Sequence, residues 1–218
     1  TSIMGWTDLV LETDLTDDQR EHLQIVRRSA DDLFTLLSDI LDLATLTTGG
    51  ATLVTGDVLP HLLVAQAADG VRARAAAKEL ALRTHVDPAV PRVLRGDAER
   101  LRHVLRHLLD NAVKFTNHGE VTVNVTKEEA GKGQVHLRFA VHDTGIGITE
   151  ADWRRLFQPF TQGDSSHSRH YMGAGMGLAI VRHLVDLMGG EVELESVVGQ
   201  GSTFSFTVPL ALTGSGSS

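Results

Sequence analysis

Apolar residues follow a helical period through the first 48 residues of the chain. Between Leu23 and Ala44 they recur alternately every three and four positions, and Phe34 and Leu41 widen the stripe. A stripe this wide favours a multi-helix bundle over a helix that packs only on its own domain. The seam consists of Leu23, Val26, Ala30, Leu33, Leu37, Ile40 and Ala44.

The ends of this helix also carry signals. Thr16 followed three residues later by Gln19 has the form of a capping box, and two glycines at 49–50 predict the end. Residues 3–11 read as the tail of an earlier helix, joined to the second by a short polar turn. Residues 1–48 are therefore predicted to form a helical hairpin with a truncated first arm.

Beyond residue 50 the pattern changes to alternating helices and strands. Such alternation predicts a mixed sheet with helices on one face, an α/β sandwich. The expected helices are 59–77, 97–115, 150–157 and 175–188, and the expected strands are 80–86, 120–127, 134–142, 191–197 and 202–208. The predicted organisation is a hairpin at 1–48, a connector at 49–56, a sandwich domain at 57–210 and a flexible tail at 211–218.

Charge and composition narrow the possible partners. The formal charge is −8, and residues 1–48 hold ten acidic and three basic side chains, which leaves 18 acidic and 17 basic elsewhere. Acidic helices repel phosphate backbones, so nucleic acid is not expected as a partner. No apolar run reaches about 18 residues, so this segment predicts no membrane contact. The absence of cysteine fits a cytoplasmic location, although a parent protein could carry an anchor upstream.

Four short segments in a fixed order carry the candidate chemistry. In the first, His107, Asn111 and Lys114 share one edge of a predicted helix. An asparagine amide oxygen suits Mg²⁺, and a lysine one turn away can meet phosphate oxygens. Alone, this edge would equally fit an exposed polar surface. The segments are HLLDNAVKFT at 107–116, DTGIGI at 143–148, LFQPF at 156–160 and GAGMGLAI at 173–180.

The second and fourth segments are glycine turns. Asp143 ends a predicted strand, and the glycines after it would let a nucleotide base approach the backbone, although Asp and Gly are also ordinary turn residues. The glycines of 173–177 open a predicted helix, whose N–H groups favour phosphate. Leu178 stands where a dinucleotide fingerprint needs its third glycine, so that motif is excluded. The polar stretch between Pro159 and Met172 predicts a nucleotide-ordered lid.

In this order and composition the four segments resemble the catalytic domain of sensor histidine kinases, which have the Bergerat-type ATP-binding fold of the gyrase, chaperone, kinase and mismatch-repair superfamily. Residues 1–48 resemble the dimerisation and phosphotransfer hairpin of these kinases, which forms a four-helix bundle in the dimer. The lid segment is similar to that of hybrid kinases.

The resemblance implies ATP and Mg²⁺ as cofactors, with Asn111 as the metal ligand and Asp143 as the residue that binds adenine. The implied catalytic residues are His107, Asn111 and Lys114, and the implied nucleotide contacts are Asn111, Lys114, Phe115, Asp143, Gly145, Gly147, Ile148, Gly173, Gly175, Gly177, Leu178 and Thr203.

The implied activity is that of a two-component kinase. The γ-phosphoryl group of ATP would pass to a histidine on the hairpin and then to an aspartate of a receiver domain, either in a response regulator or in the same polypeptide. The chain would act as a homodimer through its hairpins. Asp143 implies ATP as the nucleotide in preference to GTP.

Three departures from the family pattern keep alternatives open. No histidine lies in the expected phosphoacceptor motif, SHExRTP, which should fall just upstream of Thr1. His107 stands where these kinases usually have asparagine and related ATPases have a water-activating glutamate, and Met172 stands where glycine is common. A nucleotide-binding scaffold without transfer activity and an ATP hydrolase of the same superfamily are therefore the alternative functions.

Overall fold

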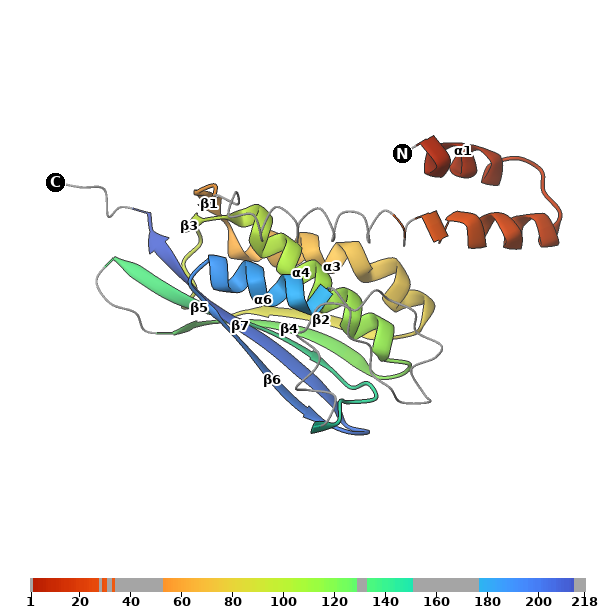
Figure 1. Ribbon diagram of the computed structural model, residues 1–218. Coiled ribbons are helices and arrows are strands. Elements are labelled where there is room, and N and C mark those ends of the chain that lie inside the picture. Colours follow the sequence, from red (N-terminus) through yellow and green to blue (C-terminus); the bar gives the residue numbers. More distant parts are fainter. Residues whose placement is uncertain are drawn as a thin grey trace. The chain divides into compact units, whose positions relative to one another are not determined.

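The chain forms two compact units, Thr1–Gly50 and Ala51–Ser218. The computed structural model, drawn in Figure 1, describes residues 2–27, 29–30, 33, 53–128, 133–150 and 177–213. Within these ranges no helix is long and apolar enough to cross a membrane.

The first unit begins as a helical hairpin. Helix α1 (Ser2–Leu11) is followed by a helical segment at 17–27. The capping box is confirmed, because the Gln19 N–H donates to Thr16 Oγ1 at 3.3 Å and the Thr16 N–H donates to Gln19 Oε1 at 3.1 Å. An ion pair between Arg27 and Asp8, with Nε and Oδ1 3.0 Å apart, joins the two arms.

The described residues include the first part of the predicted seam. Of its seven positions, Leu23, Val26, Ala30 and Leu33 are described, whereas the three later positions and the glycines at 49–50 are not. Val26 and Leu33 keep 46% and 63% of their surface exposed within this unit. An apolar stripe left exposed in this way still has surface to bury against another helix.

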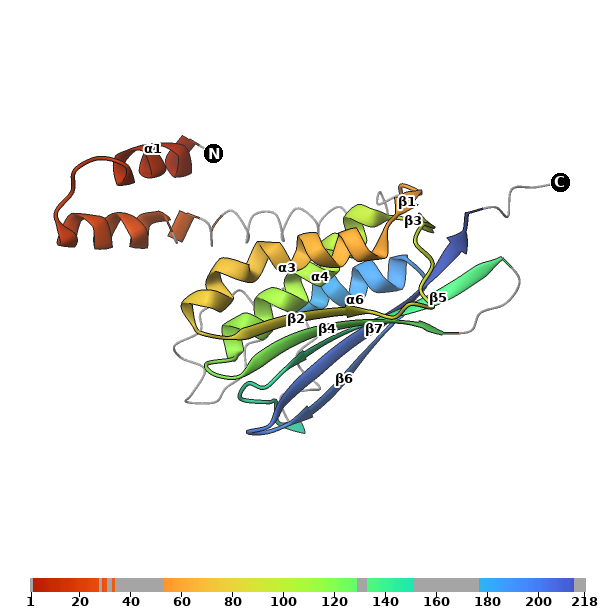
Figure 2. The ribbon, with the colours of Figure 1, turned by 180° about the vertical axis from the view of Figure 1, so that it is seen from behind.

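The second unit is an α/β sandwich. Its sheet has the strand order β1-β3-β7-β5-β4-β2, with β6 also paired to β7, and among the described strands β2 and β4 alone pair in parallel. The described helices of this unit all lie on one face of the sheet, and the opposite face, called the open face below, carries none of them (Figures 1 and 2). The strands are β1 (Gly56–Val58), β2 (Ala81–Val86), β3 (Leu94–Gly96), β4 (Glu120–Glu128), β5 (Gln134–Asp143), β6 (Glu191–Val197) and β7 (Gly201–Leu212). The helices are α3 (Pro60–Ala77), α4 (Ala98–Phe115) and α6 (Gly177–Leu187).

Strand alternation builds the core between the helices and the sheet. Alternate residues of β4, β5 and β7 are buried against the helices, and the rings of Phe139 and Phe206 stack there with centroids 4.8 Å apart. Asp97 caps α4 by accepting a hydrogen bond from the Arg100 N–H at 3.1 Å. The other oxygen of this carboxylate accepts one from the Val54 N–H at 2.9 Å.

The predicted sandwich is confirmed, with two differences in detail. β3 was not predicted, and β1 falls at the end of the expected extended connector; both are too short to show a period. β7 continues beyond the expected end at residue 208, because its last residues pair with β3. The helix expected at 150–157 lies outside the described residues except for its first position.

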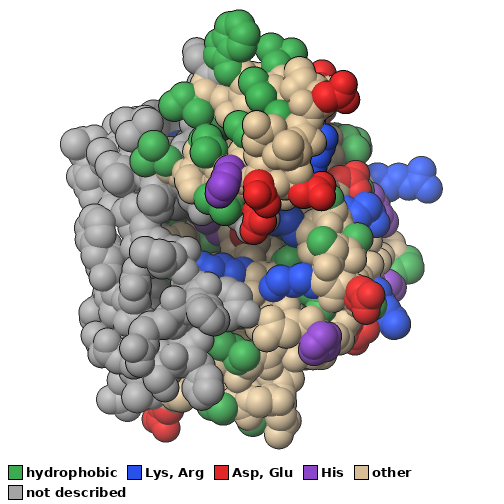
Figure 3. Space-filling model, turned by 90° about the vertical axis from the view of Figure 1, so that its right-hand side faces the viewer, with side chains coloured by type: hydrophobic (Ala, Val, Ile, Leu, Met, Phe, Trp, Pro, Cys, Tyr) green, Lys and Arg blue, Asp and Glu red, His purple; other side chains and the backbone are tan. Residues whose placement is uncertain are grey.

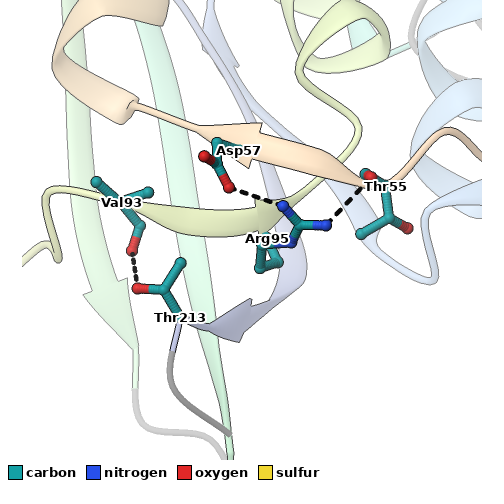
Figure 4. A network of polar contacts seen from close by, with 5 residues as sticks. All are labelled: Thr55, Asp57, Val93, Arg95 and Thr213. Atoms are coloured by element: carbon teal, nitrogen blue, oxygen red, sulfur yellow. Dashed lines mark hydrogen bonds and ion pairs between the residues drawn. The ribbon is translucent and has the colours of Figure 1, made fainter. Parts of the chain in front are cut away.

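Polar contacts fasten the edge where these short strands lie. The Arg95 guanidinium bonds Asp57 Oδ1 at 2.8 Å and the Thr55 carbonyl at 3.5 Å, joining β3 to β1 (Figure 4). Just past β7, the Thr213 hydroxyl donates to the Val93 carbonyl at 3.2 Å. These side-chain contacts add to the few backbone hydrogen bonds that such short strands can form at this edge.

Candidate functional site

Helix α4 forms the wall on which the candidate site is built. Its apolar face is packed into the core, where Leu101 and Leu105 are fully buried. At its end, the Phe115 carbonyl accepts a hydrogen bond from the Ile146 N–H at 3.4 Å. A Cβ added to Gly145 would lie only 2.5 Å from the same oxygen. Glycine at 145 therefore allows the turn after β5 to close against α4.

A lysine from the end of α3 fixes the last turn of α4. Lys78 Nζ donates to the carbonyls of Val113 at 2.7 Å, Lys114 at 2.9 Å and Thr116 at 3.1 Å. Carbonyls at a helix end lack intrahelical partners, so an ammonium group satisfies them well. Burial, and then the charge of Arg74, lower the pKa of Lys78. The turn that carries Lys114 is thereby held in place.

Asp143 lies at the end of β5 between two neighbouring strands. It pairs with Val121 of β4 and Ser202 of β7, and only 5% of its surface is exposed. Its Oδ1 accepts a hydrogen bond from the Gly145 N–H at 2.8 Å. Burial is the largest effect on this carboxyl and raises its pKa, while the Gly145 N–H, His142 and the Ser202 N–H lower it. A buried carboxylate with few protein donors is suited to accept a ligand N–H.

The turn after Asp143 packs against the hairpin that β6 and β7 form. Gly147 has φ +67°, and a Cβ there would collide with the Val197 carbonyl. The Ile148 N–H donates to Ser196 Oγ at 2.8 Å, and Ser196 Oγ lies 3.0 Å from Ser202 Oγ. Two serine hydroxyls therefore line the sheet beside Asp143.

Thr203 is not brought to this site. It was expected near the adenine, but successive side chains of a strand point to opposite faces, and Thr203 bonds His142 Nδ1 at 3.0 Å on the open face of the sheet. Ser202 is the residue that pairs with Asp143, and it is buried beside it. The register of two neighbouring strands, which the sequence did not reveal, decides between these adjacent positions.

His107 lies at the other end of the site. It is 6% exposed, and its Nε2 lies 2.9 Å from Nε2 of His103. The two rings stack with centroids 4.7 Å apart and planes inclined by 21°. A Cβ on Gly177, the first residue of α6, would lie 3.1 Å from His107 Nδ1. Helix α4 therefore contacts the turn after β5 at its C-terminal end and the first residue of α6 through a side chain in its middle. His103 was not predicted, although its position one turn before His107 could have indicated it.

The remaining predicted residues are placed only in part. Asn111 and Lys114 are partly exposed on α4, and Lys114 Nζ lies 5.3 Å from the centroid of the Phe115 ring. Leu178 is the second residue of α6 and is also partly exposed. On the face drawn in Figure 3, basic, acidic and histidine side chains are interspersed. Some of the predicted site residues lie outside the described ranges, namely Gly173, Gly175, Met172 and the LFQPF segment with the expected lid.

The candidate site thus combines a buried aspartate at a strand end, the glycine turn that follows it, and a helix that contacts both that turn and the first residue of α6, all within an α/β sandwich. Residues 96–212 match the family model of histidine kinase-, DNA gyrase B- and HSP90-like ATPases, and residues 1–49 match that of the His Kinase A (phospho-acceptor) domain. The chain belongs to this ATPase family. With both segments in this order, it is a sensor histidine kinase core.

The relatives are long signalling proteins. The chain is 36% identical to hybrid signal transduction histidine kinase A of Dictyostelium discoideum, with 96% of this chain and 10% of that protein covered. It is 38% identical to the signal transduction histidine-protein kinase BarA of Escherichia coli, with 96% and 23% covered. The crystal structure of full-length ShkA in complex with AMPPNP is 34% identical, with a TM-score of 0.77, and 97% of this chain and 43% of that one are covered. The chain thus spans less than half of each of these proteins.

The burial of Asp143 predicts a cost in stability in the absence of ligand. The pKa of Asp143 is higher in the folded protein than in the unfolded chain, so the folded state takes up a proton first as the pH falls. The unsubstituted protein should therefore gain stability relative to Asp143→Asn from pH 7 down to the pKa of the unfolded chain. We expect Asp143→Asn to melt higher than the unsubstituted protein at pH 7 and this advantage to shrink at lower pH. Thermal unfolding of both proteins without nucleotide measures it. An advantage that grows on acidification would contradict the raised pKa.

Proposed function

We propose that this chain binds ATP and Mg²⁺ and transfers the γ-phosphoryl group to a histidine on a kinase hairpin, from which it passes to an aspartate of a receiver domain. The observation that carries the proposal is Asp143, a carboxylate 5% exposed at the end of β5, beside a glycine turn that contacts α4. A carboxylate there would accept a hydrogen bond from the exocyclic amine of adenine, while the glycines leave room for the base.

The residues of α4 suit the phosphate end of the nucleotide. Asn111 supplies an amide oxygen, a ligand type that Mg²⁺ accepts, and among the described residues no group of three or more His, Cys, Asp or Glu side chains could hold a metal. A magnesium ion here would take its other ligands from phosphate and water, and when bound it neutralises phosphate charge. Lys114 adds a positive charge at the same edge, and Gly177 begins a helix whose N-terminus favours anions.

The transfer itself requires positioning more than covalent chemistry by the protein. A histidine nitrogen forms a bond to the γ-phosphorus as the bond to the leaving β-phosphate oxygen of ADP breaks. Asn111 and Lys114 would orient the polyphosphate, and Lys78 keeps their turn of α4 in place through its three carbonyl contacts. The similarity to hybrid signal transduction histidine kinases of Dictyostelium discoideum favours a receiver domain as the second acceptor.

Asp143→Asn should weaken ATP binding, because the amide cannot offer the ligand N–H a charged acceptor. Loss of such a hydrogen bond costs on the order of 1.5–3 kcal/mol, which is roughly 10- to 150-fold in Kd. Titration calorimetry with ATP and Mg²⁺ measures the change. Thr203→Ala is the matched control, since Thr203 lies on the other face of the sheet and should leave Kd unchanged. Equal affinities for Asp143→Asn and the unsubstituted protein would refute the assignment.

His107 supports hydrolysis as a second candidate function. Its imidazole is buried beside Gly177 and bonded to His103, so it lies where the phosphate end is proposed and could orient water. Incubation of the chain with γ-labelled ATP and a kinase hairpin that carries a phosphoacceptor histidine separates the candidates. Acid-labile label on the protein is the expected result. Free phosphate alone would establish a hydrolase, and neither product would establish a scaffold.

The exposed apolar side chains of the hairpin unit support a homodimer. Ile3, Trp6 and Leu9 of α1 are each more than half exposed within this unit, as are Ile25 and Leu33 of the second arm. Burial of such side chains in a four-helix bundle would gain about 1.5–3 kcal/mol for each one fully buried.

Charged substitutions in the seam test this association. We expect the unsubstituted chain to sediment as a dimer and Val26→Asp with Leu33→Asp to yield monomers, because two buried carboxylates per chain would oppose packing. Both proteins should bind ATP equally, since the sandwich unit is unchanged. A control variant, Glu21→Gln, alters an exposed hairpin position and should remain dimeric. An unsubstituted chain that is already monomeric would contradict the bundle.

A further inference from the structure

Helix α4 carries two histidines whose ring nitrogens converge. His103 and His107 are one turn apart, their rings stack, and their Nε2 atoms lie 2.9 Å from each other. His103 is half-buried, and His107 is 6% exposed. Residues four apart on a helix are neighbours on its surface, so both rings meet without distortion of the backbone.

The spacing matches that of two nitrogen ligands on one metal ion. In zinc-binding helices, two histidines at i and i+4 bind the ion from one face of the helix. Zn–N bonds of about 2.0–2.1 Å, at angles between a right angle and a tetrahedral one, place the two nitrogens roughly 2.9–3.4 Å apart. The Nε2 separation of 2.9 Å falls at the short end of this range. An ion would therefore need only a small opening of the pair.

We propose that His103 and His107 form a binding site for a divalent transition-metal ion such as Zn²⁺. Imidazole nitrogen suits Zn²⁺, Cu²⁺ and Ni²⁺, whereas Mg²⁺ prefers oxygen, so this site differs in chemistry from the oxygen ligand of Asn111. The described residues contain no group of three or more His, Cys, Asp or Glu side chains around a metal position. Two imidazoles with water in the other positions make an open, exchangeable site.

The surroundings hold the pair in a fixed orientation. Val104, Leu105 and Leu108, which lie between and beside the histidines in sequence, are buried in the core, so this part of α4 is anchored. Gly177 lies against the Nδ1 side of the His107 ring, where an added Cβ would be 3.1 Å from Nδ1. Ligands fixed in this way lose little conformational freedom on binding.

Metal binding has a defined proton balance. In the metal-free pair, one Nε2–H donates to the other Nε2, whereas an ion needs the lone pairs of both nitrogens. The bridging proton therefore moves to Nδ1 of its own ring, so that both rings stay neutral and offer an Nε2 lone pair. A metal at this position would bind the ring that contacts the first residue of α6. Any effect of the metal on phosphoryl transfer rests on the proposed function, but its binding does not.

The test is titration of the nucleotide-free chain of 218 residues with Zn²⁺ by calorimetry and with Co²⁺ by visible absorption. We expect one ion per chain, with visible bands of nitrogen-ligated Co²⁺, and at least tenfold weaker Zn²⁺ binding by His103→Gln. His85→Gln is the matched control, because His85 lies exposed on β2, and its variant should bind as the unsubstituted chain does. Excess Mg²⁺ should not displace the ion.

Two further measurements keep the outcome decisive. His107→Asn should lose the site as His103→Gln does, so a folding defect in one variant leaves the other informative. ATP affinity of His103→Gln, measured separately, should stay within about twofold, which distinguishes loss of the metal site from failure of the nucleotide site. Zn²⁺ affinity equal in His103→Gln, His107→Asn and His85→Gln would overturn the proposal, as would an absence of stoichiometric binding by the unsubstituted chain.

Discussion

The contact of α4 with two separate glycine segments is the constraint on which the site depends. At its end the Phe115 carbonyl meets the turn of Gly145, and one side of its middle meets Gly177 through the His107 ring. The approach at Gly145 excludes a Cβ, which would lie 2.5 Å from the Phe115 carbonyl oxygen, and the approach at Gly177 leaves only 3.1 Å between an added Cβ and the His107 ring. The fully buried leucines of α4 fix the helix on the sheet, so the geometry of the core determines the distance between the two ends of the site.

The buried carboxylate of Asp143 lowers the stability of the fold. Asp143 occupies a strand position that would suit an apolar residue, and its neighbours in β5 on the same face are buried valine and phenylalanine. The N–H groups of Gly145 and Ser202 offset only part of the cost of burial, because the pKa remains raised. Functional residues often lower the stability of a fold in this way. The surrounding core, including the stacked Phe139 and Phe206, supplies the stability that tolerates it.

The long periodic elements were predictable because burial repeats along them. Helix α4 and the strands β4 and β5 begin or end within one residue of the predicted positions, since their apolar faces match one core. The short β1 and β3 were not predictable, because pairing with β7 decides their structure and three residues show no period. Their existence depends on contacts across more than 30 residues of sequence.

The site was predictable as a set of segments but not as a set of contacts. Asp143 and the glycines beside it could be predicted from their motif, whereas Ser202 in place of Thr203 depends on the register between β5 and β7. Lys78 shows no signal in sequence, because its three acceptors are backbone carbonyls of another helix. The contact of His103 with His107 depends on the side-chain orientations that stack the two rings, which the sequence does not specify.

The outer strand of the sheet has a further consequence for how copies of this protein meet. β6 pairs with β7 along its length, and its alternate glutamates Glu191, Glu193 and Glu195 lie exposed on the open face. Glu193 is paired with Arg138, so two copies that aligned these strands would bring together mainly the carboxylates of Glu191 and Glu195 from each chain. Natural sheets use such charges to prevent aggregation through their edges. At high protein concentration, this repulsion would oppose the growth of chains of sandwich units through β6 and leave association to other surfaces.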